Sequence, residues 1–172
     1  MSKAKPLKKT IKKKAVTKNK KVTATSKVVN AKQFIERLKA LRSDVELEKI
    51  QRYFKLGEGQ YGEGDSFIGV RMGFVFALAK EFMEMQPDEI EKLLESRIHE
   101  VRTGGVSIMD FQARDKKTTE SRRKELFDLY INRHDRINNW DLVDRSAPHV
   151  VGGYLFDKPR KILYKLAESK NM

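Results

Sequence analysis

Few side chains in this sequence are suited to chemistry, and the most informative are Trp140 and Asp144. Trp140 is the only tryptophan in the chain. If the segment is helical, positions i and i+4 lie one turn apart on the same face. An indole and a carboxylate held side by side can pack against the apolar face of a sugar and place a negative charge near its anomeric carbon. The alternative is that Trp140 packs in a core and Asp144 pairs with a neighbouring base.

The other candidate groups favour structural roles. Three histidines, His99, His134 and His149, lack a metal-ligand spacing such as His-Glu-x-x-His, and the chain contains no cysteine. Both observations argue against zinc, iron–sulfur and thiol-based sites, so we predict no metal site. Glycines cluster from Gly57 to Gly69, but they follow a predicted helix and lack the GxxxxGK[ST] pattern of a phosphate-binding loop.

The positive charge is concentrated at the N-terminal end. The formal net charge is +13; residues 1–30 contain eleven lysines and no acid, which leaves +2 for the remainder. This tail has almost no leucine or aromatic content, so we predict that it is disordered. Its lysines should bind nucleic-acid phosphates without sequence preference, in a salt-dependent manner. The alternatives are a solubilising tail or an address signal. The lysines that we assign to nucleic-acid binding are Lys8, Lys9, Lys12, Lys13 and Lys14.

From Ala31 onward the hydrophobic period is helical almost everywhere, and no stretch shows sustained two-residue alternation. We therefore predict an all-α domain over residues 31–172, with about eight helices of roughly 10–20 residues in antiparallel pairs. A spacing of roughly 40 residues between pairs favours a HEAT-like helical-repeat solenoid. An irregular bundle around a single core is the alternative.

Local patterns predict individual elements. Phe67–Met83 is apolar on most sides, which indicates a helix buried between neighbours. Gly104 and Gly105 lie inside another predicted helix, where glycine costs about 1 kcal/mol relative to alanine, so a close helix–helix approach should compensate. Ser96 is the predicted cap of that helix, and a later helix should begin at Trp140.

Several segments carry a resemblance to a known family. These are Tyr53-Phe-Lys, Tyr61-Gly-Glu-Gly-Asp65, Phe67-Ile-Gly-Val-Arg71, His99-Glu-Val-Arg-Thr-Gly-Gly-Val-Ser-Ile-Met109 and Asn139-Trp-Asp-Leu-Val-Asp144. In these segments the chain resembles the DNA alkylation repair family, DNA glycosylases built from HEAT-like repeats. The likeness extends from about Ala31 to the end, and the WDxVD element is quite specific. The lysine tail lies outside it.

The resemblance implies a basic concave surface that binds duplex DNA. It also implies that the protein hydrolyses the N-glycosidic bond of N3- or N7-alkylated purines. It implies that Trp140 packs against the deoxyribose. Asp144 would stabilise the oxocarbenium-like sugar and orient or deprotonate the attacking water. An alkylated purine is already cationic and leaves without a general acid, so one carboxylate suffices where ordinary glycosidases need two. No cofactor is expected, and Tyr53 and Arg71 are expected to contact DNA.

Two departures from the family pattern alter these expectations. Arg71-Met72-Gly73 stands where the best-known members carry Gln-Thr-Pro, so contacts to the strand opposite the lesion should differ. Members also continue past the position of Met172 with a tryptophan and an arginine of the catalytic surface. The resemblance thus implies an N-terminal half to two-thirds, and we expect the 172-residue chain alone to be weakly active or inactive.

A non-catalytic HEAT-like module that binds DNA or protein is the alternative function, with Trp140 and Asp144 as structural residues. No apolar run approaches the ~20 residues that span a bilayer, and the first residues lack the apolar core of a signal peptide. We therefore predict that the protein makes no membrane contact, and we separately expect it to be a monomer. It should lie in the cytoplasm with the nucleoid, or in the nucleus if the cell is eukaryotic.

Overall fold

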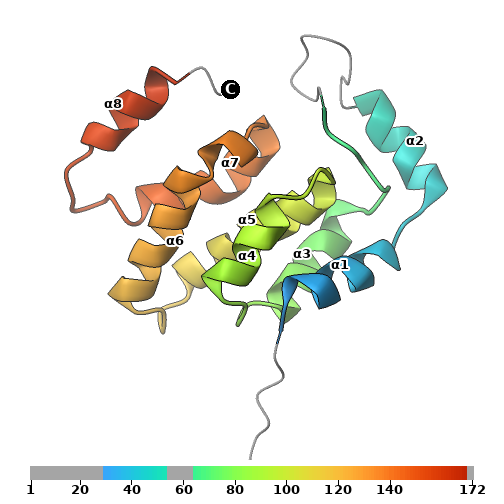
Figure 1. The fold of residues 1–172 in the computed structure, drawn as a ribbon, viewed down its shortest axis with the longest axis horizontal. Helices are drawn as coiled ribbons and strands as arrows, with labels where there is room; N and C mark the ends of the chain where they lie inside the picture. The colour runs from blue at the N-terminus through green and yellow to red at the C-terminus, as the bar shows by residue number, and fades with distance from the viewer. Residues whose placement is uncertain (1–28, 54–63, 170–172) are drawn as a thin grey trace, which may run out of the picture.

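A computed structural model describes residues 29–53 and 64–169, and every regular element within them is a helix (Figure 1). This confirms the all-α prediction. In chain order the elements are α1 (Ala31–Lys39), α2 (Asp44–Tyr53), α3 (Met72–Glu81), α4 (Pro87–Leu94), α5 (His99–Arg114), α6 (Glu120–Asn132), the 3-10 turn η1 (His134–Arg136), α7 (Trp140–Ala147), the π-helical turn η2 (Pro148–Gly152) and α8 (Lys161–Ala167). The predicted disordered tail lies almost entirely outside the described residues, together with Lys8, Lys9, Lys12, Lys13 and Lys14.

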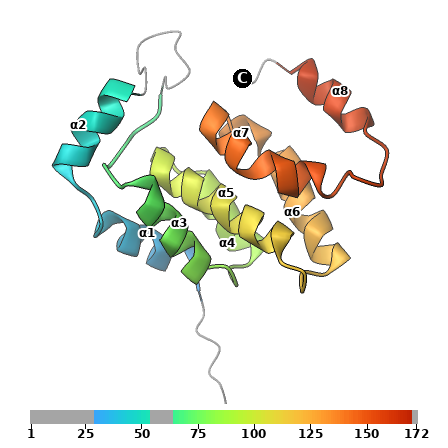
Figure 2. The same cartoon turned by 180° about the vertical axis from the view of Figure 1, so that it is seen from behind.

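The helices are arranged in two layers. Figure 2 shows α3, α5 and α7 side by side in the layer nearer the viewer, while α1, α4 and α6 lie behind them. Within the first layer α5 packs against α3 and α7; in the second, α4 packs against α1 and α6. The layers meet mainly where α4 packs against α5, and to a smaller extent where α6 packs against η2 and α5 and where α1 packs against α3. The stacking of helix pairs into a HEAT-like solenoid stays a prediction.

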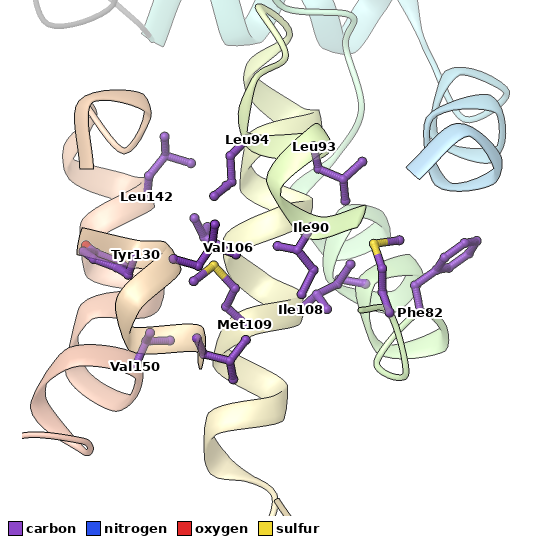
Figure 3. Close-up of a cluster of buried hydrophobic side chains, with 14 of the residues drawn as sticks. Phe82, Ile90, Leu93, Leu94, Val106, Ile108, Met109, Tyr130, Leu142 and Val150 are labelled. Atoms are coloured by element: carbon purple, nitrogen blue, oxygen red, sulfur yellow. The ribbon is translucent and has the colours of Figure 1, made fainter. Parts of the chain in front are cut away.

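Helix α5 forms the centre of the hydrophobic core. Figure 3 shows Val106, Ile108 and Met109 of this helix among buried side chains from its neighbours. A Cβ on Gly104 would lie 2.3 Å from Cζ of Phe34, and one on Gly105 would lie 3.1 Å from a methyl carbon of Leu94. The predicted close approach at the two glycines is therefore confirmed, because α1 and α4 contact the backbone of α5 at these positions.

The prediction of a helix over Phe67–Met83 is wrong for its first five residues. Helix α3 begins only at Met72, and the preceding segment, which includes Gly69, is not helical. The cause is Glu100, a completely buried residue of α5 whose carboxylate accepts hydrogen bonds from three successive backbone N–H groups. These belong to Ile68, Gly69 and Val70, at 3.0, 2.9 and 3.3 Å from Oε1. A distant acceptor thus replaces the helical hydrogen bonds that the apolar pattern favoured.

The starts of α5 and α7 show one wrong and one correct prediction. The residue before α5 is Ile98, not Ser96; the Ser96 hydroxyl instead accepts a hydrogen bond from Ile98 N at 3.0 Å. The start of α5 is fixed by a long-range pairing, in which His99 N donates to the Ser66 carbonyl at 2.8 Å. Helix α7 begins at Trp140, as predicted.

Gly69 occupies a position that no other residue fits. Its φ of +77° lies in the left-handed region, and a Cβ would stand 2.3 Å from the Ser43 carbonyl oxygen and 2.8 Å from Leu47 N. We expect Gly69→Ala to lower the free energy of unfolding by more than about 2 kcal/mol, since it combines backbone strain with overlap. Gly73→Ala is the matched control. It lies in α3, where a Cβ meets nothing within 4 Å, and should raise that free energy by about 0.5–1 kcal/mol. Urea denaturation measures both, and equal effects would contradict the assignment.

Candidate functional site

A cleft of about 500 Å³ lies between the C-terminal end of α2 and the N-terminal ends of α3 and α7. Its lining brings together three residues that were predicted separately from the sequence: Tyr53, Arg71 and Trp140. The rings of Tyr53 and Trp140 meet edge to face, with centroids 6.5 Å apart and planes at 61°. Trp140 is 46 % exposed, so its indole is not a core side chain. The cleft therefore presents two aromatic rings and a guanidinium group to solvent.

Arg71 is held in the cleft by an acid on α2. Its Nη2 donates to Oε1 of Glu46 at 2.7 Å, and Lys49 Nζ donates to the same oxygen at 2.9 Å. These two hydrogen bonds lower the pKa of Glu46 to about 2, so the carboxylate is ionised at all ordinary pH values. One acid faces two bases here, which leaves this wall of the cleft positive.

A buried ionic cluster fixes the start of α7. Asp141, which follows Trp140, accepts a hydrogen bond from Nε2 of His99 at 2.7 Å, and Nδ1 of His99 lies 3.0 Å from Asp65. Arg102 donates to the other oxygen of Asp65 at 2.6 Å. The His99 side chain has no exposed surface. The cluster ties α5, the segment before α3 and the first turn of α7 together, and so it positions Trp140.

The sequence alone does not indicate this cluster. Asp65 and Asp141 lie 34 and 42 positions from His99, and nothing in the spacing of the three residues indicates contact. The sequence does contain one signal: the histidine and both acids belong to the segments that carry the family resemblance. A group of three or more His, Cys, Asp or Glu side chains able to hold a metal ion does not occur in residues 29–53 and 64–169.

The charge state of His99 follows from its two carboxylate partners. Burial alone lowers the pKa of an imidazole, but the hydrogen bonds to Asp141 and Asp65 outweigh it, and the pKa of His99 lies above its ordinary value of 6.5. Asp65 shows the complementary shift: burial raises its pKa, but the hydrogen bonds from His99 and Arg102 lower it further than burial raises it. A doubly protonated His99 that donates from both nitrogens satisfies this arrangement.

These shifts predict how stability depends on pH. Because the folded-state pKa of His99 is raised, its contribution is complete below the unfolded value near 6.5 and is lost as the pH rises through the folded-state pKa. Asp65, with a lowered pKa, loses its contribution only in acid. We expect the urea midpoint to fall from pH 6 toward pH 9 in the wild type, with a flatter profile in His99→Gln. The variant isolates His99 from His134 and His149, and a wild-type midpoint that rises over this range would contradict the assignment.

Asp144 lies beside the cleft rather than in its lining. It is exposed on α7, one turn after Trp140, and borders a second depression of about 420 Å³ together with Pro148 and Leu163. Within the described ranges no basic side chain forms an ion pair with Asp144, whereas the neighbouring Arg145 forms one with Asp110. Two carboxylates line the cleft itself, and both already have partners: His99 engages Asp141, and Arg71 engages Glu46. Asp144 is therefore the acid next to Trp140 that is open to solvent.

A family model described as DNA alkylation repair enzyme matches residues 34–172, a range that includes every residue of the cleft. Neither the curated proteins nor the solved structures contain a match to the chain. Among the described helices none has the length and apolar character that crossing a bilayer requires.

Proposed function

The chain belongs to the DNA alkylation repair enzyme family, and this membership connects it to DNA repair. We propose that it is a glycosylase that acts on N3- and N7-alkylated purines in duplex DNA. The observation that supports this activity is the pair on α7: a half-exposed Trp140 and, one turn later, an exposed Asp144 that forms no ion pair with any residue the structure describes. Both side chains are accessible to a nucleotide, and neither is required by the core.

The proposed reaction uses the charge of the damaged base. An N-alkylated purine carries a positive charge, so its bond to C1′ breaks without a general acid and the electron pair leaves with the base. The deoxyribose packs against the indole of Trp140, and the Asp144 carboxylate offsets the positive charge that develops on the sugar. The same carboxylate orients a water molecule for attack at C1′ and takes up its proton. A normal purine is a poor leaving group under these conditions, which gives selectivity.

Arg71 and Tyr53 are proposed to bind the DNA next to the lesion. Arg71 is 60 % exposed and keeps its bond to Glu46 while its outer edge faces solvent, a geometry suited to a phosphate. Tyr53 is 63 % exposed and lies against Trp140, so the two rings form a surface on which a base or sugar can pack.

The test is base release under single-turnover conditions. Protein in large excess is incubated with duplex DNA containing 7-methylguanine, and the free base is measured against the spontaneous rate without protein. We expect slow release above that rate, and none from an unmodified duplex. Binding to the methylated duplex without release above the spontaneous rate would favour the alternative function, a non-catalytic module that binds DNA or protein.

The lysine-rich tail is proposed to add sequence-independent affinity. We expect that deletion of residues 1–30, which contain eleven lysines, weakens binding to all duplexes alike and reduces the slope of log K against log salt by several units, at about 0.9 per phosphate. Fluorescence anisotropy over a range of salt concentrations measures this slope. An unchanged slope would show that the tail does not contact phosphates.

A further inference from the structure

A second cluster of charged groups surrounds Asp110, a completely buried residue of α5. Nη1 of Arg145 lies 3.1 Å from Oδ2 of this carboxylate, and Nε of Arg114 lies 3.3 Å from the same oxygen. Nδ1 of His149 lies 2.8 Å from Oδ1. Two guanidinium groups face one carboxylate, so the cluster keeps one positive charge before the imidazole is considered. We call these four residues the Asp110 cluster.

Arg145 is held in one orientation from three sides. Its Nε donates to the Ser107 hydroxyl at 3.1 Å, in addition to the contact with Asp110. Its guanidinium lies over the rings of Phe76 and Phe111, at 4.7 and 4.8 Å from their centroids. Partial burial lowers the pKa of Arg145, which shows that water hydrates its charge incompletely. An incompletely hydrated, fixed guanidinium gains more from an incoming anion than a freely rotating one does.

The outer edges of the three groups around Asp110 face solvent. Within residues 29–53 and 64–169, Nη2 of Arg145, both Nη atoms of Arg114 and Nε2 of His149 have no hydrogen-bond partner. The side chains are 21 %, 45 % and 49 % exposed, respectively. Because all three bind one carboxylate, their unused donors lie close together. Several convergent donors around a net positive charge match the oxygens of a phosphate group.

The position of the cluster relates it to the cleft. Helix α7 and the following turn η2 run parallel to α5, as the order of their contacts shows. Asp141 contacts His99, then Arg145 contacts Ser107, and then His149 of η2 contacts Asp110. Arg145 follows Trp140 by five residues, which is about 7.5 Å along the helix at 1.5 Å per residue. A DNA strand advances about 3.4 Å per nucleotide. For a DNA strand that follows the direction of α7, this axial separation corresponds to about two nucleotides.

We propose that the Asp110 cluster binds one backbone phosphate of the DNA strand, about two nucleotides from the nucleotide that contacts Trp140. This inference rests on the proposed function, since it assigns a further contact to the same DNA. Asp110 does not bind the phosphate; it holds Arg114, Arg145 and His149 together so that their remaining donors meet the same group.

The experiment measures the salt dependence of binding to a methylated duplex with the full chain and three variants. Arg114→Gln is the main test, because Arg114 is 45 % exposed and Asp110 keeps Arg145 and His149 as partners, so we expect the fold to be retained. Arg145→Gln is the second test. Arg133→Gln is the matched control: Arg133 is 38 % exposed and binds Glu91 and Glu95 near the end of α6, in the other layer. A separate experiment titrates the wild type with inorganic phosphate alone.

We expect Arg114→Gln and Arg145→Gln each to weaken binding about tenfold and to reduce the salt slope by about one unit, with no change in slope for Arg133→Gln. Equal slopes in wild type and Arg114→Gln would overturn the assignment of the cluster while leaving the proposed function intact. Saturable binding of inorganic phosphate together with such equal slopes would assign the cluster to a free anion instead, which also overturns the proposal. If the wild type bound no DNA, the proposed function itself would be refuted, and the proposed phosphate contact of the Asp110 cluster would be refuted together with it.

Discussion

Replacing Asp144 with asparagine should lower the protein-dependent release of 7-methylguanine by about 100-fold or more, that is, to the spontaneous rate, while the fold and most of the DNA affinity remain. Asparagine has nearly the same shape but no negative charge, so the positive sugar loses its stabilising partner. The fold should not respond, because Asp144 is exposed and forms no ion pair within the described parts of the chain. Single-turnover base release measures the first quantity, and anisotropy with the same duplex measures the second.

The control for this substitution has to be an acid outside the buried clusters. Asp141 is unsuitable, although it lies on the same helix, because its bond to His99 fixes the start of α7. Asp135→Asn is better matched, since Asp135 is exposed in η1 and lies one short segment before α7. It should retain nearly full activity. If Asp135→Asn and Asp144→Asn reduced release to the same extent, the loss would reflect general electrostatics and the role assigned to Asp144 would fail.

Glu100→Ala should cause the largest loss of stability among the single substitutions considered. The change leaves three backbone N–H groups, those of Ile68, Gly69 and Val70, without the carboxylate that accepts from them. Each buried donor left unpaired costs about 1–3 kcal/mol, so we expect a loss of about 3–5 kcal/mol in the free energy of unfolding. That is a large part of the ~5–15 kcal/mol typical of a domain. Urea denaturation monitored by circular dichroism gives the value.

Two further variants separate this loss from a general effect of removing an acid. Glu100→Gln keeps one carbonyl oxygen at the same place and should recover part of the stability. Glu84→Ala removes an exposed glutamate and should change the free energy of unfolding by less than about 0.5 kcal/mol. If Glu100→Ala were as mild as Glu84→Ala, the segment before α3 would not depend on the buried carboxylate.

The sequence predicted those parts of the fold whose cause is local. The start of α7 at Trp140 and the close approach at Gly104 and Gly105 follow from neighbouring residues or from the missing side chain itself. The non-helical segment after Phe67 was not predictable in the same way. Its local pattern is apolar and favours a helix, and the group that prevents the helix is a carboxylate about 30 positions away.

The same distinction holds for the site. The family resemblance indicated Tyr53, Arg71 and Trp140 one by one, and the structure places all three around one cleft. The contacts that orient the site, above all His99 with Asp141, join residues on different helices. Such contacts depend on how α5 and α7 lie against each other, which no spacing within either helix reveals.

The parallel alignment of α5 and α7 has a consequence for changes in chain length. Three polar contacts, at Asp141, Arg145 and His149, recur every four residues along one side of the chain from α7 into η2. One residue inserted between Trp140 and His149 would rotate everything after it by about 100°. It would thereby withdraw Arg145, His149 or both from a buried acid. An insertion in the turn between α5 and α6, at residues 115–119, rotates no such side chain against α5. Natural variation in length should therefore be tolerated at that turn and be rare within α7.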